Sequence, residues 1–320
     1  MSSKNDYFQF PKFKSKWWAW NGHVHTIFAS QFLKIRNIPA KRLEIKTPDN
    51  DFLELDVLEH SDPKGTVALF HGLEGSTERI YIRNLMSDLY ETGYSSVALN
   101  FRGCGHKMNN QKRLYHSGET SDYKLVFEWI KKQFSGIPVY AVGFSLGANA
   151  LIKSLGEEGS AHLSDKSVAV SPPFDLLKGS IDMHSGFNRL YEYRFIQTLT
   201  KKAELKRKQF PEIPEFKGKS MYDFDNEITG PIHGFKNAED YYEQSSSKHF
   251  VRDVQRPLLI IHSKQDTICP LEYAPHDELA KNPFIKTLFT RRGGHVGFLS
   301  NPPNWLNRTI IHWFEQPNDL

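Results

Sequence analysis

Apolar and polar residues follow two kinds of pattern along most of the chain. Residues 41–47 and 52–58 alternate apolar and polar positions around a turn at 48–51, which predicts an antiparallel hairpin with one face in water. More continuously apolar runs are typical of strands buried in a parallel sheet; they lie at 66–70, 95–101, 137–142, 167–171, 257–262 and 286–290.

Segments whose apolar residues have helical spacing lie between or after these runs. This spacing predicts helices at 80–92, 121–134, 148–153, 271–279 and 305–314. Strands that alternate with helices after an antiparallel start indicate an α/β fold, a doubly wound and mostly parallel sheet with antiparallel N-terminal strands. In such sheets the reactive groups lie at the carboxyl ends of the strands.

One connection is too long for this scheme. Roughly 80 residues separate the run at 167–171 from the run at 257–262, whereas βα connections usually add only a few residues to a helix. We expect residues 174–250 to form a cap inserted into a single domain that spans residues 1–320. The pattern predicts helix through 181–208 and irregular structure through 210–234.

The first 40 residues are rich in aromatic side chains without a clean helical period. These aromatic residues are Phe8, Phe10, Phe13, Trp17, Trp18, Trp20, Phe28 and Phe32. We expect residues 1–40 to be an irregular arm that packs over the body; attachment to a membrane surface is the alternative, because aromatic residues and lysines mix in interfacial anchors. His23 and His25 stand two residues apart without a third metal ligand nearby, so we expect them to be structural.

Composition narrows the class of protein. With 39% hydrophobic and 24% charged residues and a net charge of +4, the chain is typical of a globular protein. The densest basic run, 201–208, predicts a solvated helix face and no nucleic-acid site. Cys104 and Cys269 offer neither a disulfide framework nor metal-ligand spacing. No apolar run approaches about 18 residues, which predicts no transmembrane helix. Residues 1–6 lack the apolar core of a secretory signal, so we expect a cytoplasmic protein.

A pentapeptide carries the candidate chemistry. Gly143-Phe144-Ser145-Leu146-Gly147 follows one predicted strand and precedes a predicted helix. A nucleophilic serine needs this strand–turn–helix context, because the tight turn projects the hydroxyl from the edge of the sheet and leaves no room for side chains beside it. The alternative is a glycine-bounded turn with an incidental serine. The context favours Ser145 as a nucleophile.

Two further residues follow strand ends where they would meet this serine. Asp266 comes after the strand at 257–262, and His295 comes after the strand at 286–290 within a Gly-rich loop. A serine hydroxyl needs a base to accept its proton, and the imidazole of that base needs a carboxylate to fix its tautomer. Competing acids stand nearby in the sequence: Glu272, Asp277 and Glu278.

A tetrahedral intermediate also needs hydrogen-bond donors for its oxyanion. The backbone N–H of Leu146 is the first candidate, and the backbone N–H of Leu73, after the strand at 66–70, is the second. We interpret His71 as a residue that shapes this loop rather than as an acid or base.

At this point the chain resembles the α/β-hydrolase superfamily and, within it, the YheT-like family. The matching stretches run along almost the whole chain: 22–27, 69–75, 100–104, 143–149, 171–176, 233–235, Tyr241-Tyr242 and 293–298. The family often has Asp-Asp-Pro at its acid, where this chain has Gln265-Asp266-Thr267, and His25 stands where glutamine is expected.

The resemblance implies a carboxylic ester hydrolase with a catalytic triad of Ser145, Asp266 and His295. From this triad and the aromatic residues of the cap we expect a cofactor-free serine esterase of short- to medium-chain acyl or lipid esters. Phe174, Phe187, Leu190, Tyr191, Tyr193 and Phe195 could line an acyl pocket or could form the core of the cap. An acyltransferase with the same acyl-enzyme and a non-catalytic lipid-binding hydrolase fold are the alternatives.

Overall fold

Eight strands form one mixed sheet in the computed structural model, which describes residues 10–317. The strands are β1 (Lys41–Lys46), β2 (Phe52–Leu58), β3 (Thr66–Phe70), β4 (Ser95–Asn100), β5 (Val139–Phe144), β6 (Lys166–Val170), β7 (Leu258–Ser263) and β8 (Ile285–Thr290). Their spatial order is β1-β2-β4-β3-β5-β6-β7-β8. The pairs β1–β2 and β2–β4 are antiparallel and all other pairs are parallel. The predicted fold class is therefore confirmed.

The hairpin differs from the prediction in its burial. β1 is a largely exposed edge strand, whereas almost all of β2 is buried. The polar face of β2 is covered by Thr77, whose hydroxyl donates to Asp56, and by the loop at Gly105, which packs against the Glu54 carboxylate. The predicted wet face of β2 is thus wrong. Its polar residues are satisfied inside the protein: Asp56 accepts from Arg42 Nε at 2.7 Å across the strand pair.

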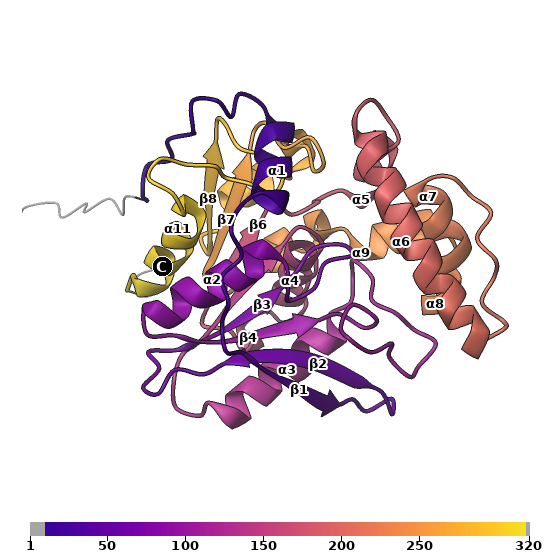
Figure 1. The fold of residues 1–320 in the computed structure, drawn as a ribbon, viewed down its shortest axis with the longest axis horizontal. Coiled ribbons are helices and arrows are strands. Elements are labelled where there is room, and N and C mark those ends of the chain that lie inside the picture. The colour runs from indigo at the N-terminus through magenta and orange to yellow at the C-terminus, as the bar shows by residue number, and fades with distance from the viewer. Residues whose placement is uncertain (1–9, 318–320) are drawn as a thin grey trace, which may run out of the picture.

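Helices cover both faces of the sheet (Figure 1). α2 (Ile80–Glu91) and α11 (Trp305–Glu315) bury their apolar residues in the core on one face. α3 (Ser121–Gln133), α4 (Leu146–Glu158) and α10 (His276–Lys281) bury theirs in the core on the other. The predicted helix at 271–279 is divided, because Pro275 separates a 3-10 turn (Leu271–Tyr273) from α10.

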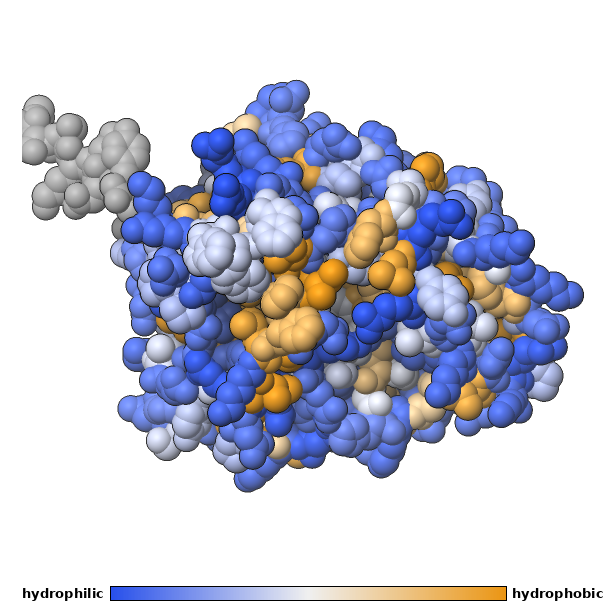
Figure 2. All heavy atoms as spheres, turned by 45° about the horizontal axis from the view of Figure 1, so that its top comes forward, coloured by the Kyte–Doolittle hydropathy of each residue, from blue (hydrophilic) through white to orange (hydrophobic). Residues whose placement is uncertain are grey.

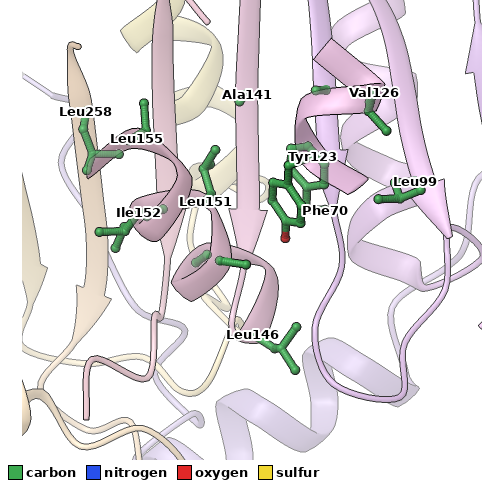
Figure 3. Close-up of a cluster of buried hydrophobic side chains, with 14 of the residues drawn as sticks. Phe70, Leu99, Tyr123, Val126, Ala141, Leu146, Leu151, Ile152, Leu155 and Leu258 are labelled. Carbon is green, nitrogen blue, oxygen red and sulfur yellow. The ribbon is translucent and has the colours of Figure 1, made fainter. Parts of the chain in front are cut away.

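The core beneath α3, α4 and α10 fixes the helix that follows Ser145. Phe70 of β3 and Tyr123 of α3 stack with ring centroids 3.8 Å apart (Figure 3). The Tyr123 hydroxyl donates a hydrogen bond to the carbonyl of Gly147, 3.0 Å away. Figure 3 also places Leu155 of α4 near Leu258 of β7. The Ser145 N–H also donates to the carbonyl of Val170 at 2.9 Å, so buried groups hold the turn at Ser145 and at Gly147.

Residues 174–250, called the inserted segment below, consist mostly of helices beside the sheet (Figure 1). These helices are α5 (Leu176–Met183), α6 (Asn188–Gln209), α7 (Met221–Phe224), α8 (Gly230–His233) and α9 (Ala238–Ser245). The expected helix through 181–208 is present as the end of α5 and α6. The stretch 210–234 is more regular than predicted, because Ser220 and Asp223 form a capping box that starts α7.

The N-terminal region departs from the expected irregular arm. Gly22–Gln31 form a helix, α1, whose start is capped by Asn21 accepting from Val24 N–H at 2.9 Å. Packing over the body holds for Phe13, whose ring centroid lies 4.8 Å from that of Trp305. It fails for Trp17, which is 87% exposed. Phe8 and residues 1–6 lie outside the described residues.

Candidate active site

Ser145 stands in the sharp turn between β5 and α4. Its φ of 54° is a left-handed value that a residue with a side chain adopts only when its surroundings require it. The two flanking glycines are required by space. A Cβ on Gly143 would lie 2.4 Å from the carbonyl oxygen of Gly147, and one on Gly147 would lie 2.5 Å from that of Phe70. A side chain at either glycine would therefore force the backbone of the turn to shift.

The structure brings the three predicted side chains together at the carboxyl ends of the strands. His295 Nε2 lies 2.8 Å from Ser145 Oγ, and His295 Nδ1 lies 2.9 Å from Asp266 Oδ2. Serine, histidine and carboxylate therefore form one hydrogen-bonded chain, with each atom placed for proton transfer from the serine hydroxyl to the imidazole.

Asp266 is the acid that contacts the imidazole. Its other oxygen, Oδ1, accepts from the backbone N–H groups of Ile268 at 3.0 Å and Cys269 at 2.9 Å. Burial alone would raise the pKa of Asp266, but the charge and hydrogen bond of His295 outweigh burial and hold that pKa below its usual range. Asp266 is therefore ionised and fixed in orientation.

The same pair sets the basicity of His295. Burial lowers the pKa of the imidazole, and the Asp266 carboxylate more than offsets this, so the pKa of His295 is raised above its ordinary value of 6.5. With Nδ1–H donating to Asp266, Nε2 is the nitrogen that faces Ser145. This arrangement favours the tautomer that a general base needs.

The backbone of the histidine loop is anchored on α1. Thr26 Oγ1 accepts the N–H of His295 at 2.8 Å and donates to the carbonyl of Gly22 at 2.8 Å. α1 and the loop that carries Asp266 approach so closely that a Cβ on Gly22 would lie 1.8 Å from the carbonyl oxygen of Gln265. α1 therefore touches both the acid loop and the histidine loop. In the sequence, residues 22–27 stood out as a motif, but nothing indicated that they contact these two loops.

His25 belongs to the same anchor. It is fully buried, and its Nδ1 accepts the N–H of Leu299 at 3.0 Å while Nε2 lies 3.2 Å from Ser15 Oγ. Burial lowers the pKa of His25 to about 4, so the ring is neutral. Within residues 10–317 no group of three or more His, Cys, Asp or Glu side chains is placed to hold a metal ion.

The loop after β3 lies against the serine. A Cβ on Gly72 would be 3.1 Å from Ser145 Cβ, and Leu73 and Leu146 both line the cavity in front of Ser145. His71 is fully buried and spans the loop: Nδ1 donates to the carbonyl of Gly72 at 2.7 Å, and Nε2 accepts the N–H of Phe101 at 3.2 Å. Burial lowers the pKa of His71 to about 3. His71 shapes the loop, as predicted.

A cavity of about 800 Å³ opens in front of Ser145 and His295. Of the six side chains proposed from the sequence for an acyl pocket, Tyr191 and Phe195 line it. Phe174 is instead buried in the core between sheet and helices. The other three, Phe187, Leu190 and Tyr193, are exposed. Further apolar walls, which the sequence did not reveal, come from Met183, Leu199, Met221, Phe224, Ile228 and Ile268.

One wall of the cavity is polar. Lys202 Nζ of α6 lies 2.6 Å from Glu74 Oε1, and the Tyr115 hydroxyl donates to the same oxygen at 2.7 Å. Both charged side chains of the pair are largely buried. Lys206, one turn later, is also buried and donates to the carbonyl of Gln111 at 2.5 Å. The prediction of a fully solvated basic face on this helix is therefore wrong.

Comparisons with known proteins agree with this geometry. The family model described as serine aminopeptidase, S33, matches residues 61–283, which include Ser145 and Asp266. The candidate esterase YheT of Escherichia coli is 33% identical over 92% of this chain and 90% of its own length. The monoacylglycerol lipase of Saccharomyces cerevisiae is 28% identical over 87% of this chain and 62% of its own length. A solved esterase of Pyrococcus furiosus, 19% identical, covers 96% of this chain and 98% of its own with a TM-score of 0.60, a likeness that shows the fold.

Proposed function

For this chain, which belongs to the α/β-hydrolase family described as serine aminopeptidase, S33, we propose the hydrolysis of carboxylic esters through an acyl-enzyme on Ser145. The single observation that carries the proposal is the hydrogen-bonded chain from Ser145 Oγ through His295 to Asp266, at 2.8 Å and 2.9 Å. Relatives named as an esterase and a lipase support an ester rather than an amide as the substrate.

In the proposed reaction, His295 Nε2 takes the proton of Ser145 while Oγ attacks the ester carbonyl. The oxyanion that forms would accept hydrogen bonds from the backbone N–H groups of Leu73 and Leu146, and the second of these stands at the start of α4, where the helix dipole adds to the stabilisation. His295 then gives the proton to the departing alcohol. Water, activated by the same imidazole, releases the acid.

The cavity supports an apolar acyl group as the part of the substrate that is held. Its volume of about 800 Å³ and its walls of Met183, Phe195, Leu199 and Phe224 suit a short- to medium-chain acyl or lipid ester. All four of these side chains belong to residues 174–250. We therefore propose that the inserted segment acts as a cap that excludes water and sets acyl length, within a single domain.

Hydrolysis of p-nitrophenyl esters of increasing chain length tests this proposal. The expected profile has its maximum at short to medium acyl chains, and Ser145→Ala should lower kcat by at least about 10³-fold without a change in KM of comparable size. Phe195→Ala, which enlarges the cavity, is expected to move the maximum toward longer chains. Undiminished hydrolysis by folded Ser145→Ala protein would refute the assignment, and so would the absence of ester hydrolysis at every chain length.

A further inference from the structure

Large apolar side chains are exposed on two segments that are far apart in the chain. Trp17, Trp20 and Phe32 are 87%, 65% and 68% exposed. In the inserted segment, Phe187 and Leu190 are 50% and 52% exposed. We call these five side chains the apolar face. Contiguous exposed apolar residues are uncommon on soluble proteins and mark interaction sites.

The two segments meet beside the cavity. The ring of His23 in α1 lies 4.5 Å from that of Phe187, and its Nδ1 lies 3.1 Å from the Tyr191 hydroxyl. Phe32, which follows the end of α1, and Tyr191 of α6 both line the cavity. Figure 2 shows apolar side chains gathered over the middle of this side of the molecule, around a hollow. Of the apolar face, Phe32 lines the cavity itself; Trp17 and Trp20 stand close to Trp18 in the sequence, and Phe187 and Leu190 stand close to Tyr191, and Trp18 and Tyr191 also line the cavity.

The N-terminal segment that carries part of this face has only basic charges. Residues 10–36 contain no Asp or Glu and five basic residues, Lys12, Lys14, Lys16, Lys34 and Arg36. Arg36 is paired with Asp88, while Lys12, Lys14 and Lys34 are exposed.

The part of the inserted segment that carries Phe187 and Leu190 is also basic at its surface. Residues 184–203 expose Arg189 and Arg194, and their one acid, Glu192, is 3% exposed. The neighbouring Asp182 accepts a hydrogen bond from the Tyr273 hydroxyl at 2.5 Å. Two copies of such a face would repel each other, whereas an anionic surface would be attracted to it.

We propose that the apolar face docks on an anionic lipid bilayer, with the mouth of the cavity against the lipid. Aromatic and aliphatic side chains enter the headgroup region, and lysines beside them attract anionic headgroups. No helix within residues 10–317 has the length and apolar character to span a bilayer. Docking needs no catalysis, and only the delivery of a lipid ester to Ser145 rests on the proposed function.

Co-sedimentation with lipid vesicles tests the docking. Full-length Ser145→Ala protein, which cannot turn over lipid by the proposed mechanism, is mixed with vesicles of phosphatidylcholine alone or with phosphatidylglycerol added. We expect about tenfold stronger binding to the vesicles that contain phosphatidylglycerol, and a loss of this preference in high salt. Added Trp17→Ser and Trp20→Ser substitutions should weaken binding at least tenfold, and Lys12→Gln and Lys14→Gln should each weaken it about fivefold.

Leu43→Ser provides the matched control. Leu43 is an exposed apolar residue, 39% accessible, on β1 at the edge of the sheet remote from β8. It should leave vesicle binding unchanged, and circular dichroism checks that every variant is folded. Equal binding by the tryptophan variants and their parent would overturn the proposal. So would equal binding to both kinds of vesicle, or self-association that the tryptophan substitutions abolish in a protein that binds no vesicles.

Discussion

Replacement of Thr26 by valine tests whether α1 positions the catalytic loop. Valine keeps the shape of threonine but removes the hydroxyl that accepts the N–H of His295 at 2.8 Å. That N–H would then lie in a largely buried site without its acceptor, which costs about 1–3 kcal/mol. If the loop relieves this cost by moving His295 away from Ser145, kcat/KM falls by about 5- to 150-fold.

The assay is the pH profile of kcat/KM for a soluble p-nitrophenyl ester, measured beside thermal melting. Thr26→Ser keeps a hydroxyl and is expected to remain within about twofold of the parent, whereas Thr26→Val should lose activity mainly through kcat. A folded valine variant with the activity of the serine variant would refute the positioning role of Thr26.

Three other predictions follow from the same structure. Activity should rise with pH through a pKa above 6.5, because neutral His295 is the base; Asp266→Asn should move this inflection to lower pH and reduce kcat by about 10³- to 10⁴-fold in the pH-rate profile. Gly22→Ala should lower both activity and melting temperature, since its Cβ would lie 1.8 Å from a backbone oxygen of the acid loop, while Gly179→Ala, with open space at its Cβ, should not lower the melting temperature. Burial raises the pKa of Asp225 from 3.8 to about 6. The contribution of Asp225 to the free energy of unfolding is therefore greatest below pH 3.8 and falls by up to about 3 kcal/mol as pH rises through 6. Denaturant titrations of Asp225→Asn should show a weaker pH dependence of stability than those of the parent.

The sheet was predictable because its signals are local. Buried parallel strands such as β3 and β7 are continuously apolar, and the rules of α/β topology place the residues that follow them at one edge. The two glycines around Ser145 then identify the turn, because only they fit its space. These features need no knowledge of distant contacts.

The anchor of the histidine loop was not predictable in this way. Thr26 binds the backbone of a residue 269 positions later, and a main-chain N–H leaves no signature in the sequence. The burial of Lys202 likewise depends on Glu74, 128 positions away. α1 escaped notice because Phe28 faces outward while His25 faces the core, which leaves no single apolar stripe. The catalytic roles themselves stay predictions.

Labelling by a fluorophosphonate probe tests the central claim most directly. The probe reacts with a serine hydroxyl only where a base activates it, so peptide mass spectrometry of the labelled full-length protein should locate the adduct on Ser145. The adduct should be absent from Ser145→Ala and strongly reduced in His295→Ala. An adduct on another residue, or ester hydrolysis by protein whose Ser145 stays unlabelled, would contradict the account.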